Sequence, residues 1–234
     1  MSIRLLSEPA AAWLCLALTL GLYFLSKRLY RQFGWRLLQP LVIVPAVLGA
    51  FLLVTGIPYR VYLEDTGWLG WLLGPATIAF AVPIYERRDV IRRHWLALAI
   101  GVSAGVVSAV AGSYGLARLL DLSPDLQRAL AIRSISTPFA LLVSDQVGTP
   151  RDLTAVLVII TGLIGLILGE LVLLLLPLRS RLARGALFGA GAHGVGTARA
   201  RELGNEEGVV ASMTMMIAGV TMVLIAPLLS RLLN

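Results

Sequence analysis

The sequence predicts an all-α polytopic membrane protein with about six full transmembrane helices and one or two broken or re-entrant segments. The 234 residues are 58% hydrophobic and only 14% charged, whereas soluble domains carry about 25% charged residues. Long runs are also almost free of charge, and each approaches or exceeds the ~20 residues that a helix needs to cross a membrane. A chain of this size cannot bury so many apolar helices in protein, so we expect lipid to surround them.

The expected spans, in chain order, are residues 9–26, 38–59, 66–85, 95–117, 153–176 and 208–230. Loops 27–36, 86–93 and 179–184 are rich in basic residues, and the positive-inside rule predicts that they are cytoplasmic. With that sidedness, residues 125–148 must begin and end on the same side of the membrane. We therefore expect a re-entrant or broken segment there.

The chain reads as a single membrane domain, 1–234, with two halves of similar layout, 1–118 and 119–234. Each half contains a short segment interrupted by small residues between two long spans. Such paired interruptions are typical of transporters built from inverted repeats, with the binding site at the repeat interface. The net charge of +7 lies mostly in the loops, which argues against nucleic acid as a partner.

Three stretches break the helical pattern: LLGPATIAFAVPIY (72–85), SISTPFALLVSD (134–145) and GAGAHGVGTARA (189–200). A helix that begins inside the membrane presents unpaired N–H groups and the positive end of its dipole, which together favour an anion. We expect these stretches to form a substrate-binding site. Its candidate residues are Gly74, Pro75, Thr77, Ser136, Thr137, Pro138, His193, Gly194, Gly196 and Thr197. The alternative is that the stretches are kinks with only a structural role.

Two ionisable residues at membrane depth are candidates for proton coupling, His193 and Glu170. Glu170 has an equally plausible structural role as the partner of Arg133 or Arg199. Arg199 is also expected to pair with Glu202 on the same helix face. With one cysteine and no metal-ligand spacing, neither a metal nor a cofactor is expected.

Two pairs of glycines have the GxxxG spacing that allows helices to pack closely in lipid, Gly101 with Gly105 and Gly165 with Gly169. We interpret both pairs as packing surfaces.

The same three stretches, with the residues around them, resemble the LrgB/CidB family over roughly residues 69–227. The resemblance implies a bacterial inner-membrane protein whose partner is a small holin-like protein of the LrgA/CidA type. It also implies a functional role for the motif positions Gly74, Pro75, Thr77, Thr137, Pro138, His193, Gly196 and Thr197.

Two functions follow from this resemblance. The first is a carrier of small monocarboxylates of the glycolate, glycerate, lactate or pyruvate class, coupled to protons. The alternative is an antiholin-like regulatory subunit that modulates the holin-like partner, murein hydrolase activity and cell lysis. An enzyme is not expected; the expected partners are a small organic anion, the lipid bilayer, the holin-like protein and a second copy of the chain in a homo-oligomer.

Overall fold

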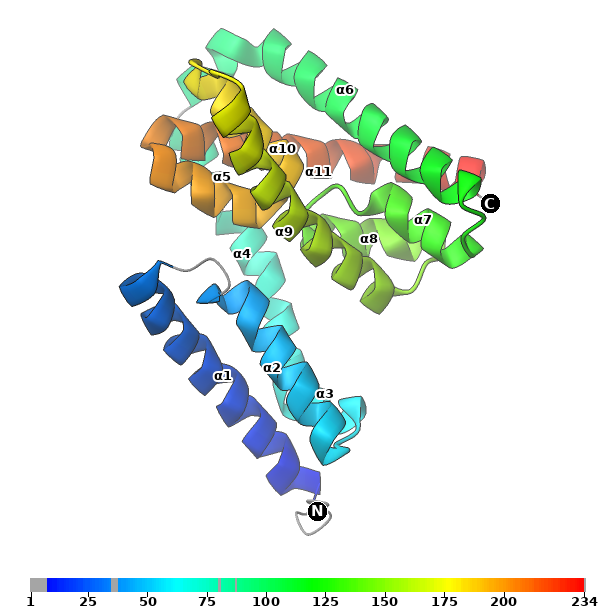
Figure 1. Cartoon of the computed structure of the whole chain (residues 1–234). Coiled ribbons are helices and arrows are strands. Elements are labelled where there is room, and N and C mark those ends of the chain that lie inside the picture. Colours follow the sequence, from blue (N-terminus) through cyan, green and yellow to red (C-terminus); the bar gives the residue numbers. More distant parts are fainter. Residues whose placement is uncertain (1–7, 35–37, 80, 87, 234) are drawn as a thin grey trace. The chain divides into compact units, whose positions relative to one another are not determined.

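The computed structural model describes residues 8–34, 38–79, 81–86 and 88–233. These residues form helices and turns with no strand (Figure 1), which confirms the predicted all-α fold. Four of their helices are long and apolar enough to cross a membrane, namely α1 (Glu8–Phe33), α6 (Arg88–Leu119), α9 (Arg151–Leu175) and α11 (Asn205–Leu233). The protein is therefore a multi-pass helical membrane protein. Phe80, in the first interrupted stretch, and residues 35, 36 and 87 of the basic loops lie outside the described residues.

Two of the expected spans are not single long helices. Helix α2 (Pro40–Thr55) has only 16 residues, because Gly56 adopts a φ of 69° and its N–H bonds to the carbonyl of Leu52, a common way to end a helix. In the region of the expected span 66–85, the described residues include the 3₁₀ helix η2 (Gly67–Leu72) and two short helices, α4 (Leu73–Ala79) and α5 (Ala81–Glu86). The change from η2 to α4 comes directly before Gly74, where the sequence predicts an interruption.

The chain divides into two compact units, and the first runs to Pro75. Within it, α1 packs against α2 and against α3 (Tyr59–Thr66). Ala11, Ala12 and Val61 are buried together in its core. The boundary between the units does not coincide with that between the half-repeats 1–118 and 119–234, which stay a prediction.

The second unit, residues 76–234, is organised around α11, whose buried side chains extend along most of its length. The C-terminal half of α11, including Met222, shares a core with α6, α7 (Pro124–Ile132) and α8 (Thr137–Val147). Its N-terminal half, including Ala211, shares a second core with α9 and α10 (Arg181–Leu203). Helix α11 therefore holds two groups of helices together.

Helices α7 and α8 form a first hairpin, residues 124–147, as the predicted broken segment requires. Helix α7 ends at Ile132 and α8 begins at Thr137, so the residues between them form the tip. At the base, Thr149 Oγ1 donates to the carbonyl of Asp125 at 3.2 Å, so the segment begins and ends in the same place. The arms have 9 and 11 residues, about 14–17 Å at 1.5 Å per residue, which is roughly half of a ~30 Å hydrocarbon layer.

Helix α10 forms a second hairpin, with its tip at His193. His193 has a non-helical backbone, with φ 49° and ψ −124°. A straight helix of 23 residues would be about 34 Å long, yet Arg181 at its start pairs with Glu206, just beyond its end, at 3.0 Å. A Cβ on Gly196 would collide with the carbonyl of Phe188, which shows how closely the two arms pass. The third interrupted stretch of the sequence is thus the tip of a re-entrant hairpin.

Helix α9 connects the bases of the two hairpins. Its first residue, Arg151, follows the base of the first hairpin, and its last, Leu175, leads to the base of the second. Its 25 residues correspond to about 37 Å. The hairpins therefore enter the unit from opposite ends of a membrane-spanning helix.

Candidate functional site

The tips of the two hairpins meet near the middle of α9. The ring of His193, at the tip of the second hairpin, lies against the backbone of Ser134, at the tip of the first, with Arg133 close by. Arg133 Nη1 donates to Thr161 Oγ1 at 2.7 Å, and Thr161 lies near the centre of α9. Polar groups from two hairpins, whose bases lie at opposite ends of α9, therefore converge near the middle of that helix.

The N-terminus of α8 contributes backbone donors to this junction. Ser136, the residue before the helix, makes no capping hydrogen bond with its side chain, although it is buried. Pro138 occupies the first turn, a position that suits proline because no donor is lost there. A buried helix start without a side-chain cap leaves N–H groups and the positive end of the dipole for another acceptor. Thr137, the first helical residue, adds a partly buried hydroxyl.

His193 is held in an unusual conformation. Its side chain is 4% exposed, and its Nε2 atom is buried with no hydrogen-bond partner among the described residues. A positive φ is rare for a residue other than glycine, and such strain tends to persist where it serves a function. The imidazole is therefore fixed at the junction, with one buried ring nitrogen that has no partner among the described residues.

Arg133 is the residue that the sequence analysis did not place in the site. It directly precedes the tip sequence Ser134–Ser136, and Nη2 donates to Ser113 Oγ of α6 at 3.2 Å. Its Nε atom is buried without a hydrogen-bond partner, and none of the carboxylates in the described part of the chain pairs with it. An arginine between the end of α7 and the proline-initiated start of α8, inside a segment expected to be re-entrant, is the signal that could have identified it.

The other candidates of the third stretch support the tip. Thr197 Oγ1 donates to the carbonyl of His193 at 2.8 Å and lies 3.8 Å from Met215 Sδ, so its hydroxyl braces the strained turn. Gly196 allows the two arms to cross, and Gly194 is exposed with open space around it. Thr214, next to Met215 on α11, is a buried residue whose hydroxyl has no partner among the described residues, and the sequence analysis did not single it out.

The candidates of the first stretch fall on α4. Gly74 and Pro75 close the first unit and Thr77 belongs to the second. The convergence of residues at the hairpin tips therefore concerns the second and third stretches.

Glu170 has a partner at membrane depth. Its carboxylate pairs with Arg199 on the second arm of α10, and Arg199 also pairs with Glu202 at 2.9 Å. The pairing of Arg199 with Glu202 confirms the expected contact between residues three apart. Of the two partners considered for Glu170, the structure selects Arg199. The role of Glu170 in proton coupling stays a prediction.

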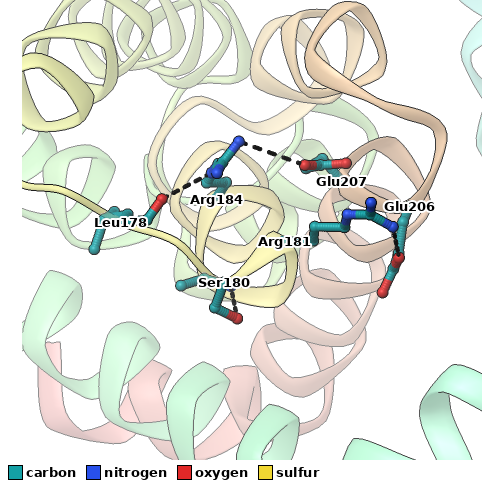
Figure 2. A network of polar contacts seen from close by, with 7 residues as sticks. Leu178, Ser180, Arg181, Arg184, Glu206 and Glu207 are labelled. Atoms are coloured by element: carbon teal, nitrogen blue, oxygen red, sulfur yellow. Dashed lines mark hydrogen bonds and ion pairs between the residues drawn. The ribbon is translucent and has the colours of Figure 1, made fainter.

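A polar network fixes the base of the second hairpin to α11 (Figure 2). Arg181 pairs with the exposed Glu206 at 3.0 Å, and Arg184 Nη1 lies 3.8 Å from Oε1 of the buried Glu207. Arg184 Nε also donates to the carbonyl of Leu178 at 2.8 Å. These contacts hold both ends of α10 at the same end of the unit.

Space for a small ligand adjoins Arg133. A cavity of about 520 Å³ lies between the first hairpin, α9 and the first arm of α10. Arg133 and Thr161 supply its polar side chains, and its other walls are glycines and apolar residues such as Leu130 and Ile164. Within the described ranges, no three His, Cys, Asp or Glu side chains gather to hold a metal ion.

The fold and this site define a multi-pass helical membrane protein built around two discontinuous segments that meet at mid-span. The chain belongs to the LrgB-like family, whose family model matches residues 19–232. It is 36% identical over 214 residues to the uncharacterized protein YwbG of Bacillus subtilis (strain 168), and the match covers 92% of this chain and 95% of that protein. No solved structure matches the chain.

Proposed function

We propose that this protein carries small monocarboxylates, of the glycolate, glycerate, lactate or pyruvate class, across the bacterial cytoplasmic membrane. The observation that supports the proposal is the meeting of two half-membrane hairpins, from opposite ends of α9, at Arg133 and His193. Discontinuous helices whose N-termini face an anion at the bilayer midplane are a recurring solution for transporters.

The chemistry of the junction suits a carboxylate. Arg133 offers a guanidinium, the start of α8 offers N–H groups, and the unpartnered ring nitrogen of His193 donates to a carboxylate when the imidazole is protonated. Hydrogen bonds from charged donors to a carboxylate are among the strongest in proteins. The adjoining cavity gives the short carbon chain of the acid an apolar wall.

Within this proposal, His193 carries the coupled proton. Its Nε2 atom is free of protein partners among the described residues and lies at the junction, whereas the carboxylate of Glu170 is already held by Arg199.

Proteoliposomes test the proposal. The full chain is expected to take up a labelled small acid in a pH-dependent way, and His193→Ala and Thr137→Val should lower uptake without loss of protein. Two matched controls should retain uptake: His94→Ala, at the kink of α6, and Thr19→Val, whose hydroxyl bonds to the carbonyl of Cys15. If folded protein transports none of these acids, alone or with its partner, the carrier proposal is wrong.

That outcome would favour an antiholin-like regulatory subunit. Such a subunit should bind a small holin-like membrane protein, and its effect on cell lysis should be insensitive to His193→Ala and Thr137→Val. Co-purification with the neighbouring holin-like protein and a lysis assay on the same variants distinguish the two functions.

A further inference from the structure

We propose that Arg133 sets the charge of the substrate, so that the site accepts one carboxylate and rejects a molecule with two. This inference rests on the proposed carrier function and assigns its charge selectivity to one residue.

The environment of Arg133 is polar but does not neutralise its charge. Its guanidinium is held by two hydroxyls, Thr161 Oγ1 at 2.7 Å and Ser113 Oγ at 3.2 Å. Thr161 in turn donates to the carbonyl of Leu157 at 2.7 Å, so its oxygen is oriented to accept from Arg133. Hydroxyls fix the position of the guanidinium without neutralising it, and a charge at this depth is costly unless something compensates it. An anionic ligand supplies that compensation.

Two other cations near the hairpins of the second unit are already paired with carboxylates. Arg128, on α7 and five residues before Arg133, pairs with Asp125 at 2.6 Å near the base of the first hairpin. Arg199 is engaged by Glu170 and by Glu202. Arg133 therefore provides the uncompensated positive charge at the tips.

The cavity beside Arg133 has no second cation among the described residues that line it. Its remaining walls are apolar or glycine, with Thr161 as the other polar side chain. A second carboxylate in this space would lie among apolar side chains at membrane depth with no cation to pair with, which disfavours binding. One carboxylate fits the charge of the site and two do not.

Binding to the purified full chain in lipid nanodiscs, measured by calorimetry, tests this inference with three related probes. Glycolate carries one carboxylate, hydroxymalonate carries two, and glycolamide carries none. The unmodified protein should bind glycolate about ten- to a hundredfold more tightly than either of the others, the range expected for a hydrogen bond to a charged group. Arg133→Gln should bind glycolate and glycolamide about equally, whereas Arg128→Gln should keep the original preference.

A gain-of-function variant keeps the test decisive if Arg133→Gln does not fold. Ile164 lines the same cavity one helical turn beyond Thr161, so Ile164→Lys adds a second cation there. It should bind hydroxymalonate at least about tenfold more tightly than the unmodified protein. Retained preference for glycolate in folded Arg133→Gln, or no gain in Ile164→Lys, overturns the role of Arg133 while leaving the carrier proposal intact. If the unmodified chain binds none of the three probes, the carrier proposal itself fails and this inference with it.

Discussion

Replacing His193 with glycine is expected to separate the backbone role of this position from the role of its imidazole. The φ of 49° and ψ of −124° at His193 resemble the first central position of a type II′ turn, which glycine occupies most readily. A residue other than glycine in such a sparsely populated region costs about 1–3 kcal/mol. In an ordinary helix, glycine is instead less stable than alanine by roughly 0.5–1 kcal/mol.

The magnitude follows from comparing two variants that both lack the imidazole. His193→Ala keeps the strained backbone and His193→Gly relieves it, so the glycine variant should be the more stable by about 1 kcal/mol or more. For a chain of this size, that difference corresponds to roughly 2–4 °C in melting temperature. Thermal unfolding of purified protein in detergent measures it. Ala190, on the first arm of the same helix, provides the control, because Ala190→Gly should lower the melting temperature.

The same pair of variants then tests the imidazole. Both should lose most of the uptake of a small acid if His193 binds the substrate or the coupled proton. A glycine variant less stable than the alanine variant would refute the strained turn, and full uptake by either variant would refute the role of the ring.

Two further predictions concern packing and the hairpin base. Gly165→Ala should lower the stability by about 1–3 kcal/mol, because the added Cβ would collide with the backbone of the second hairpin. Gly105→Ala should instead raise the stability by roughly 0.5–1 kcal/mol, because it lies inside α6 and nothing lies within 4 Å of the new atom. Chemical unfolding in detergent compares the two, and equal effects would contradict the packing of α9 against α10. Arg184→Gln should cost about 1–3 kcal/mol by leaving the buried Glu207 without its cation. Arg181→Gln should change the stability much less, because its ion pair is exposed to solvent. A larger effect from Arg181→Gln than from Arg184→Gln would show that the network has been assigned wrongly.

The interruptions of the helices were predictable from the sequence because glycine and proline act locally. Proline suits the first turn of a helix, and Ser136 and Thr137 directly precede Pro138. The break between α7 and α8 ends at this point, because α8 begins at Thr137. The small residues around His193 likewise indicate a break, and α10 turns at that residue. Each of these features depends on a few neighbouring residues, which is what a sequence pattern reports.

The path of α10 and the partners of the charged residues depend on contacts between distant residues. Nothing local to residues 189–200 shows that the chain returns to its starting point, which the pairing of Arg181 with Glu206 reveals. The sequence suggests Arg133 only as a partner for Glu170, because its position beside His193 depends on the meeting of two hairpins far apart in the sequence.

The two glycine pairs make the same point. Gly165 and Gly169 lie against the second hairpin, whereas a Cβ on Gly101 or Gly105 would meet no described atom within 4 Å. The prediction of close packing is therefore confirmed for the pair on α9, and the pair on α6 has no such neighbour in the described part of the chain. Identical spacing has different consequences because the surroundings differ.

The sidedness of the two hairpins tests the central claim most directly. In a background that carries Cys15→Ala, single cysteines placed at Ser180 and Asn205 flank the second hairpin, and single cysteines at Ser123 and Gln146 mark the base of the first; all four positions are exposed. A membrane-impermeant thiol reagent should label the first pair from the cytoplasmic side and the second pair from the outside. Labelling of Ser180→Cys and Asn205→Cys from opposite sides would show that α10 crosses the membrane, and would contradict a site formed by two opposing hairpins.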